Sequence, residues 1–346
     1  MSSPGSAISK GPCQSPKRRF LAALFGGPVD RIPVANAVSV AHAELMRACD
    51  AFFPEAHLDA NVMARLAAAG HEIIGFDTVM PVFSVVQEAA ALGCSIAWGS
   101  QGMMPAAVSH PFAERGVFEL PLDWMGAPSI RVVLDALSLL RTRLGCRVAL
   151  IGKVMGPWSL SYAMFGTEEF LVRTLTDPDA VARSLEVLKK VTISFARAQI
   201  AAGADVICVA DHATDMISPL MYGDMLLPVH QHIIAAMGCP TILHCCGNTS
   251  DRVSLFAKAG FDCFHFESKV DPAHARREAG GRMRLMGNMN CPQLLRSGGT
   301  SEIRRACLTV LAAGIPILSP ECAVPLDTPS QNLAALVEAA EESVLC

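Results

Sequence analysis

The amino-acid sequence predicts an α/β fold: a single (β/α)8 barrel of the TIM type, with extra decoration near its N-terminus. Three observations support this prediction. The chain has 346 residues, of which 51% are apolar and only 17% charged, so it can bury a large core. Apolar runs of strand length alternate with longer amphipathic runs along most of the chain. Eight such apolar runs occur, as a closed (β/α)8 barrel requires.

The eight apolar runs are short, and most of them do not alternate between apolar and polar residues. Such runs are typical of parallel strands that are buried on both faces of a sheet. The region before Leu120 is also expected to carry segments that decorate the barrel. The expected strands are Ile32–Ala35, Ile74–Met80, Val148–Val154, Asp205–Ala210, Thr241–Cys245, Phe261–Phe266, Met283–Met286 and Ile315–Ser319.

The amphipathic runs between the strands predict the helices that cover the sheet. Several of them begin at Pro or Asp and are followed by Gly, which are common signals for the start and the end of a helix. The expected helices are Leu58–Ala69, Arg131–Leu144, Asp177–Ala202, Pro219–Met237, Ser301–Ala313 and Pro329–Val344.

The chain is expected to form one domain, because no low-complexity linker and no internal repeat divides it. Residues 1–16 are expected to be a flexible tail and residues 17–346 to form the barrel. A doubly wound open sheet is the alternative fold. It is disfavoured because no GxGxxG turn follows any expected strand.

Composition argues against several classes of partner. The net charge is −4 with both signs interspersed, and no comparable basic run follows Lys17–Phe20, so nucleic acid is not expected. No run approaches the roughly 18 apolar residues of a membrane span, and Leu21–Phe25 is too short for a secretory signal. We therefore expect no membrane contact and a cytoplasmic location. The 13 cysteines are interpreted as buried thiols or metal ligands rather than as a disulfide framework.

Polar residues and thiols recur directly after the expected strands, at the end of a barrel where active sites form. For Asp211 and Asn288, two interpretations stay open: they cap helices and loop amides, or they face a bound substrate. The residues at the strand ends are Asp211, His212, His244-Cys245-Cys246-Gly247-Asn248, Glu267, Gly287-Asn288, Glu321 and Cys322.

His244, Cys246 and Cys322 form a candidate zinc site. In extended backbone, His244 and Cys246 point to the same side while Cys245 points to the other. Cys322 is distant in sequence, but strand ends converge at the rim of a barrel. Three protein ligands leave one tetrahedral position open, as catalytic zinc sites do. The alternative is that these cysteines are ordinary buried core residues.

Glu88 is the candidate for a fourth metal ligand. It is an acid inside the apolar run Val85-Val86-Gln87-Glu88-Ala89, close to an expected strand end. Its side chain lies either at a strand edge or in the mouth of the barrel, and only the second position would bring it to the metal.

Several motifs occur together along the chain. They are Arg18-Arg19-Phe20-Leu21-Ala22-Ala23-Leu24, Pro28-Val29-Asp30-Arg31-Ile32-Pro33-Val34, Gly75-Phe76-Asp77, Glu88-Ala89-Ala90-Ala91-Leu92-Gly93, His244-Cys245-Cys246-Gly247-Asn248, Gly287-Asn288, Leu318-Ser319-Pro320-Glu321-Cys322-Ala323-Val324-Pro325, Thr328-Pro329 and Asn332. Together they resemble the uroporphyrinogen decarboxylase superfamily, and within it the cobalamin-dependent methyltransferases of the methylcobamide:coenzyme M type.

The HxC pattern with a distal cysteine is the most specific part of this resemblance, which spans about Arg18 to Asn332. The chain departs from the decarboxylase branch, because it continues Ala35-Asn36-Ala37-Val38 where that branch has an arginine-rich motif. It also has Glu88-Ala89-Ala90 in place of the family's EAE, so the second acid is missing.

The resemblance implies an enzyme that moves a methyl group between a methylated corrinoid and a zinc-activated thiol such as coenzyme M. His244, Cys246 and Cys322 would hold zinc, and a separate carrier protein would bring the corrinoid to the barrel mouth. Asp211 and Asn288 would then face the substrate or the corrinoid. A free thiol is mostly protonated at neutral pH, and zinc would deprotonate it on binding.

Three other functions remain open at this point. The chain could demethylate a methyl ether or another methyl donor onto a Co(I) corrinoid, with zinc acting on the leaving group. It could decarboxylate a tetrapyrrole, as uroporphyrinogen decarboxylase does. It could also be a non-catalytic partner of a corrinoid protein.

Overall fold

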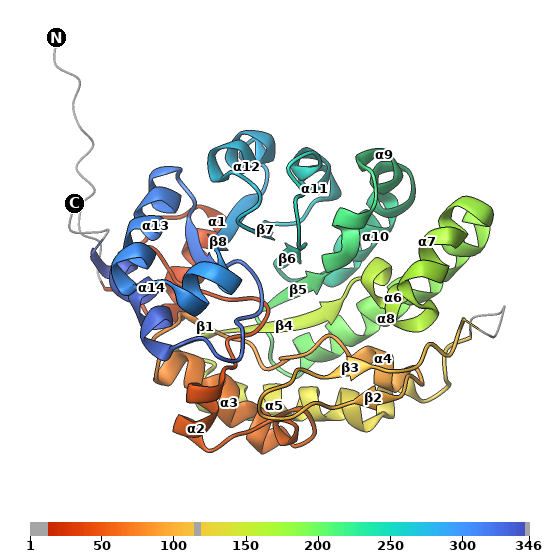
Figure 1. Ribbon diagram of the computed structural model, residues 1–346, viewed down its shortest axis with the longest axis horizontal. Helices are drawn as coiled ribbons and strands as arrows, with labels where there is room; N and C mark the ends of the chain where they lie inside the picture. Colours follow the sequence, from red (N-terminus) through yellow and green to blue (C-terminus); the bar gives the residue numbers. More distant parts are fainter. Residues whose placement is uncertain (1–12, 114–118, 343–346) are drawn as a thin grey trace, which may run out of the picture.

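The computed structural model describes residues 13–113 and 119–342 and has a curled sheet of seven parallel strands at its centre (Figure 1). The order of the strands across the sheet is β1-β4-β5-β6-β7-β8-β9. A separate antiparallel pair, β2 (Ile96–Ala97) and β3 (Ala106–Ala107), lies outside this sheet. The strands of the sheet are β1 (Thr78–Val79), β4 (Ala149–Met155), β5 (Val206–Ala210), β6 (Thr241–His244), β7 (Cys263–Phe266), β8 (Arg284–Met289) and β9 (Ile317–Pro320).

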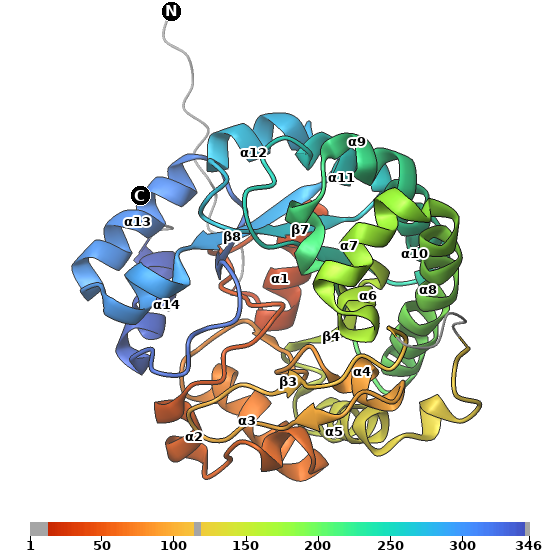
Figure 2. The same cartoon turned by 45° about the vertical axis from the view of Figure 1, so that its right-hand side comes forward.

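Helices surround the sheet, as Figure 2 shows. Shorter helices decorate the first half of the chain, in agreement with the expected extra segments. None of the described helices is both long and apolar enough to cross a membrane. The covering helices are α3 (Ala60–Glu72), α5 (Pro128–Leu144), α8 (Pro178–Ala201), α10 (Leu227–Met237), α11 (Val253–Ala259), α12 (Pro272–Ala279), α13 (Thr300–Ala312) and α14 (Ser330–Glu342); the others are α1 (Pro16–Phe25), α2 (Ala43–Cys49), α4 (Gln87–Ala91), α6 (Pro157–Phe165), α7 (Thr167–Thr176) and α9 (Pro219–Met221).

The strands of the sheet are buried on both faces. Every residue of β4, β5, β6, β7 and β9 is buried, on the side of the helices as well as inside the curled sheet. This confirms the interpretation of the non-alternating apolar runs as parallel strands.

The first of the eight expected strands is not formed as a strand. Within Ile32–Ala35, only Val34 pairs, through a single bridge to Leu318 in β9. Pro33 has no N–H and can only accept a hydrogen bond there, which it does from Leu318. The seven-strand sheet therefore has a single bridged residue where the sequence predicted a further strand.

Two other expected elements differ from the structure. The expected strand Ile74–Met80 is reduced to the two residues of β1, because Gly75 has a left-handed φ of 96° that interrupts extended backbone. The expected helix Pro219–Met237 is divided into α9, a π-helical turn at Tyr222–Leu226, and α10. Pro228 lies in the first turn of α10, where a missing N–H is tolerated. Because Pro228 cannot donate a hydrogen bond to the preceding turn, it interrupts the helix before α10.

Helix α1 lies at the end of the sheet where the strands begin. Its Lys17 N–H donates to the carbonyl of Arg147, just before β4, and Lys17 Nζ lies 2.6 Å from Asp205, just before β5. Ser15 caps the helix and Pro16 begins it, so these two residues of the expected tail belong to the fold. Residues 1–12 lie outside the described residues.

A group of four charged residues fixes α1 to the strands; Arg19 and Asp77 are buried, and Asp30 and Arg31 are half-buried. Arg19 contacts Asp30 and Asp77 at 2.6 Å each, and Arg31 contacts Asp77 at 2.9 Å. Asp77 also accepts a hydrogen bond from Val34 N–H at 2.8 Å. Burial acts against ionisation of Asp30, but its hydrogen bond from Arg19 lowers its pKa to about 2. The opening motif therefore supplies a fully paired charge cluster at the amino end of the strands.

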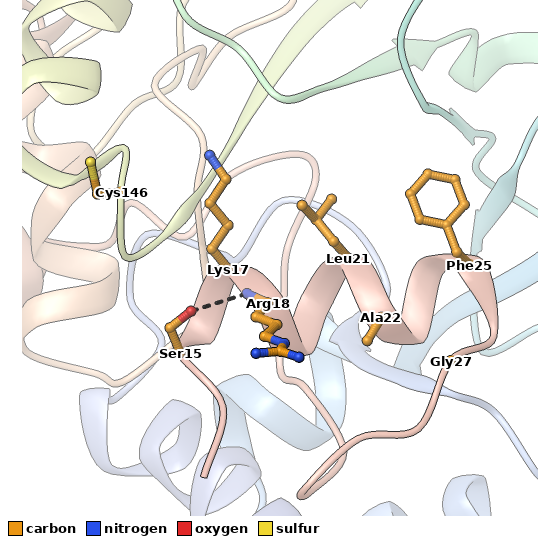
Figure 3. A pocket seen from close by; sticks show the side chains of 8 residues that line it. All are labelled: Ser15, Lys17, Arg18, Leu21, Ala22, Phe25, Gly27 and Cys146. Atoms are coloured by element: carbon orange, nitrogen blue, oxygen red, sulfur yellow. Dashed lines mark hydrogen bonds between the residues drawn. The ribbon is translucent and has the colours of Figure 1, made fainter. Parts of the chain in front are cut away.

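A surface hollow of about 590 Å³ lies beside α1 (Figure 3). Leu21 and Phe25 of α1 line it, together with Cys146. Because Cys146 precedes β4, the hollow is at the amino end of the strands, away from the polar strand ends. It is therefore not the candidate site.

Candidate metal centre

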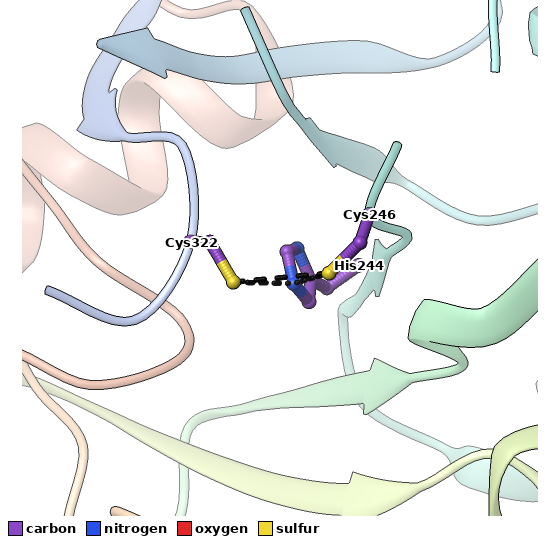
Figure 4. A group of neighbouring side chains, drawn as sticks. All are labelled: His244, Cys246 and Cys322. Carbon is purple, nitrogen blue, oxygen red and sulfur yellow. Dashed lines mark hydrogen bonds between the residues drawn. The ribbon is translucent and has the colours of Figure 1, made fainter. Parts of the chain in front are cut away.

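The ends of β6 and β9 bring the three expected zinc ligands together (Figure 4). Cys246 Sγ lies 3.4 Å from His244 Nε2 and 3.8 Å from Cys322 Sγ, and Cys322 Sγ lies 3.6 Å from His244 Nε2. No other group of three potential ligands is this compact among the described histidines, cysteines and acids. This convergence is the arrangement that the metal-site interpretation predicts.

The separations match a tetrahedral zinc site. Bonds of about 2.3 Å to sulfur and about 2.0 Å to nitrogen place two sulfur ligands about 3.8 Å apart, and sulfur and nitrogen about 3.5 Å apart. The measured separations are 3.8 Å for the two sulfurs and 3.4 and 3.6 Å for sulfur and nitrogen. The donor set is therefore preformed, and its fourth corner is not supplied by a member of this group.

The ring of His244 is oriented by its neighbour on β7. His244 Nδ1 faces the carbonyl of His265 at 3.3 Å, so this nitrogen carries the hydrogen. The lone pair of Nε2 is then directed toward the two sulfurs and is available to a metal. His265 in turn lies 2.7 Å from the carbonyl of Pro320 through its own Nε2, and the two imidazole rings are 4.7 Å apart. Burial lowers the pKa of His265 to about 3, so this ring stays neutral.

The two thiols are in hydrogen-bond contact with each other at 3.8 Å. The hydrogen bond from Cys246 holds the pKa of Cys322 well below its usual range, and the same contact raises the pKa of Cys246. Two cysteine sulfurs beside an imidazole are a donor set that zinc prefers.

The turn that carries Cys246 requires glycine at position 247. Gly247 has a left-handed φ of 76°, and a Cβ there would lie 1.8 Å from a carboxylate oxygen of Asp215. The N–H of Cys246 donates to the carbonyl of His212 at 3.1 Å, which holds the turn against the loop after β5. The HCCGN motif is thus a strand end followed by a constrained turn.

The loop that carries Cys322 is held by Glu321. This buried carboxylate accepts hydrogen bonds from Ser268 N–H at 2.7 Å and from Cys291 N–H at 2.9 Å. The carbonyl of Cys322 accepts a hydrogen bond from Asn36 at 3.3 Å. Loops from three different parts of the chain therefore fix the position of the third ligand.

Glu88 lies outside the compact ligand group. It is 1% exposed at the start of α4, and its Oε1 accepts a hydrogen bond from Met155 N–H at 2.7 Å. Burial raises the pKa of this carboxyl. The interpretation of Glu88 as an acid at the carboxyl end of the barrel is consistent with this position, but its hydrogen bond is to β4 rather than to a ligand.

Glu267, at the end of β7, is closer to the thiols. Its carboxylate interacts with the thiol of Cys246 and accepts a hydrogen bond from Gly247 N–H, while burial raises its pKa. The position after an expected strand was the signal for this residue, but the sequence did not indicate that it contacts a ligand.

Asp211 and Asn288 both make structural hydrogen bonds. Asp211 accepts from Ser159 N–H at 2.6 Å at the start of α6 and lies 2.9 Å from His230 Nε2. Asn288 donates to the carbonyls of Glu267 and Val270 at 3.2 and 3.0 Å. Of the two interpretations for these residues, these contacts match the capping of helices and loops.

Lys153 is a further charged residue near this site that the sequence analysis did not single out. It lies inside β4 and is buried, and its ammonium interacts electrostatically with Cys322. The signal for it was a lysine in the middle of an apolar strand.

Comparison with known proteins places the whole chain in one family. The family model of uroporphyrinogen decarboxylase (URO-D) matches residues 15–343. A methylcobamide:CoM methyltransferase MtaA from Methanosarcina barkeri is 32% identical over 330 residues, which cover 94% of this chain and 97% of the relative.

Two further relatives come from Methanosarcina mazei. A methylated-thiol–coenzyme M methyltransferase is 31% identical and covers 95% of this chain and 90% of its own length. A solved structure described as a methyltransferase superposes with a TM-score of 0.92 at 31% identity, covering 95% of this chain and 99% of that one. The chain therefore belongs to the uroporphyrinogen decarboxylase family, in which it is an enzyme of the methylcobamide-dependent methyltransferase branch.

Proposed function

We propose that this enzyme transfers a methyl group between the corrinoid of a carrier protein and a thiol that binds as thiolate to zinc. The observation that carries the proposal is the tetrahedral spacing of His244 Nε2, Cys246 Sγ and Cys322 Sγ. The names of the relatives support coenzyme M as the first thiol to test.

The residues of the site have separate roles in this reaction. When bound, zinc supplies the positive charge that lowers the pKa of a coordinated thiol. His244 is held in position by the carbonyl of His265, so that its Nε2 faces the ligand group. Cys246 and Cys322 are partly exposed rather than fully buried, so the fourth corner is accessible from the mouth. A thiol held there is aligned for in-line attack on a methyl group presented from outside.

We infer that Glu267 rather than Glu88 occupies the fourth corner before the thiol binds. Glu267 interacts with Cys246 and follows a strand next to β6, whereas Glu88 is engaged by the backbone of β4. When the thiolate binds, it replaces the carboxylate of Glu267, so that one negatively charged ligand takes the place of another.

A partner surface at the same end supports a separate carrier protein. Large apolar side chains are exposed on segments that follow β1, β4 and β5, among them Val108, Leu175 and Leu220, which are 63%, 79% and 74% exposed. Such side chains suit contact with another protein. We propose that the carrier docks there, so that its corrinoid faces the thiols.

The proposal also includes closure of the sheet as an eight-membered barrel. Ala35 N–H donates to the carbonyl of Leu318 in β9, and Asp77 N–H, beside β1, donates to the carbonyl of Val34. Residues 33–35 would thus take the eighth position between β9 and β1.

The test is a methyl-transfer assay with zinc analysis of the same preparation. We expect about one zinc per chain, and demethylation of methylcobalamin that depends on an added thiol. Calorimetry near pH 7 in buffers of different ionisation enthalpy should show about one proton released per thiol bound. Absence of bound metal would refute the proposal. Transfer from a methyl ether to cob(I)alamin, without transfer to any thiol, would establish the opposite direction instead.

A further inference from the structure

The side chain of Lys153 points into the curled sheet. Its neighbour Gly152 faces the covering helix α8, since a Cβ there would lie 2.7 Å from the amide oxygen of Gln199. Successive side chains of a strand point to opposite faces, so Lys153 points to the interior. It is 1% exposed, and its Nζ has no hydrogen-bond partner among the described residues.

The ammonium of Lys153 lies among groups at the carboxyl end of the strands. Cys208, its register neighbour on β5, Glu88 and the ligand Cys322 all interact with it electrostatically. Its charge also lowers the pKa of His57 and His212, although burial is the larger cause for both. Burial lowers the pKa of Lys153 to about 8, so the side chain is mostly protonated at neutral pH.

A buried cation without a partner is costly, because burial removes its water shell and nothing replaces it. The charged residues at the amino end of the strands avoid this cost, since Arg19 and Arg31 are paired with carboxylates. Lys153 has no such hydrogen-bonded partner in the described part of the chain, and Glu88, Cys208 and the ligand Cys322 act on it only electrostatically.

The loaded centre brings a further negative charge to this group of residues. Zinc with the thiolates of Cys246 and Cys322 and the neutral His244 has no net charge. A thiolate that binds in the fourth position adds one negative charge to the site, whether that position was open or held by Glu267, because a displaced carboxylate keeps its own charge beside the centre. His244 is only 1% exposed, so solvent screens this charge weakly on that side.

We propose that Lys153 is the buried counter-cation of the metal centre, a positioning residue that favours a negatively charged ligand in the fourth position. The inference rests on the proposed function. According to this inference, Lys153 stabilises the negative charge of the sulfur that binds zinc and does not contact the other end of the substrate.

The variant that tests this is Lys153→Met, which keeps the length of the side chain and removes its charge. Lys189→Met is the matched control, because Lys189 is a mostly buried lysine on α8 that is paired with Glu186, away from the site. Three probes are titrated into each zinc-loaded protein by calorimetry: 2-mercaptoethanol, 2-mercaptoethanesulfonate and the neutral ligand imidazole. Thermal unfolding of the metal-free proteins is measured in parallel.

We expect Lys153→Met to retain zinc and to weaken both thiols by the same factor, about tenfold or more. Imidazole binding should not change, because imidazole adds no charge to the centre. Thermal unfolding of the metal-free variant should stay cooperative, which shows that weaker thiol binding is not a loss of the fold. Lys189→Met should match the wild type in all three titrations.

Other results would overturn the inference. Unchanged thiol affinity would show that the charge of Lys153 does not act on the metal centre. If only 2-mercaptoethanesulfonate binds more weakly, Lys153 acts on the sulfonate at the far end of the substrate instead. If the wild-type protein binds zinc and thiol, the proposed function is retained whatever the Lys153 variant does. If the wild-type protein binds neither, both the proposed function and the inference about Lys153 are wrong.

Discussion

The two ends of the sheet differ in whether their charged side chains have hydrogen-bonded partners. At the amino end, Arg19 and Arg31 contact Asp30 and Asp77 at 2.6 to 2.9 Å, so each buried charge has a partner. At the carboxyl end, Lys153 Nζ has no partner among the described residues. Both ring nitrogens of the fully buried His57 are likewise without one.

The difference separates the charges that stabilise the fold from the groups that belong to the candidate site. Paired charges at the amino end add specificity to the packing of α1 against the strands, and their loss is felt as instability. At the carboxyl end, buried groups keep unused hydrogen-bonding capacity, as groups that face a binding site do. This is the division expected of barrel enzymes, whose chemistry lies at the carboxyl ends of the strands. Changes at the two ends should therefore affect different measurements.

The largest effect should come from Cys322→Ala. Removing one of three protein ligands should weaken zinc binding by more than about 100-fold and abolish thiol-dependent methyl transfer, while the barrel stays folded. Metal content by elemental analysis, together with the methylcobalamin assay, measures both.

The control is Cys245→Ser, beside a ligand but buried on the other side of the strand end. It should keep its zinc. Retained demethylation of methylcobalamin in Cys322→Ala, or loss of zinc in Cys245→Ser, would contradict the assignment of the ligands.

At the amino end, Arg19→Met should cost stability without touching the metal. It leaves Asp30 without its main partner and Asp77 with Arg31 alone, and breaking a buried pair from one side costs about 3–5 kcal/mol. Urea unfolding measures this loss. The folded fraction should bind zinc as the wild type does. A variant as stable as the wild type would show that the cluster does not hold α1 in place.

The same cluster should give a pH-dependent signature. The folded pKa of Asp30, about 2, is below its ordinary value near 4, so the carboxylate stabilises the fold above pH 4 and loses that contribution as the pH falls toward 2. The stability difference between the wild type and Asp30→Asn should thus be largest near neutral pH and shrink below pH 4. Denaturant unfolding from pH 7 to pH 2.5 measures it. A difference that does not vary with pH would rule out this carboxylate as the titrating group.

The sequence predicted that His244, Cys246 and Cys322 lie together, because their placement follows from simple geometry. Extended backbone puts His244 and Cys246 on one side, and the convergence of strand ends accounts for Cys322. It predicted the first strand less well because Pro33 cannot donate a hydrogen bond, so only Val34 is bridged.

The roles of the acids could not be read from the sequence in the same way. An acid after a strand can turn toward a ligand, as Glu267 does, or toward a backbone N–H, as Glu321 and Glu88 do. The choice depends on loop conformations that involve distant parts of the chain. Lys153 was visible as a charge within an apolar strand, but its missing partner appears only in three dimensions.

The smallest expected effect distinguishes two acids at the carboxyl end, Glu267 and Glu88. If Glu267 occupies the fourth corner before the thiol binds, then Glu267→Gln should weaken zinc by about tenfold or less, because a neutral amide is a poorer ligand than a carboxylate. It should also make thiol binding easier relative to that loss, since no anion has to be displaced. Glu88→Gln should leave zinc affinity unchanged, because Glu88 accepts its hydrogen bond from Met155 on β4 and Gln can accept it as well. Competition with a chelator gives the zinc affinities, and calorimetry gives those of the thiol.

Loss of zinc in Glu88→Gln with none in Glu267→Gln would show that Glu88, not Glu267, occupies the fourth position. It would also mean that a carboxylate from the α4 side, next to Lys153, reaches the metal, so that the lysine already has its negative partner before substrate binds.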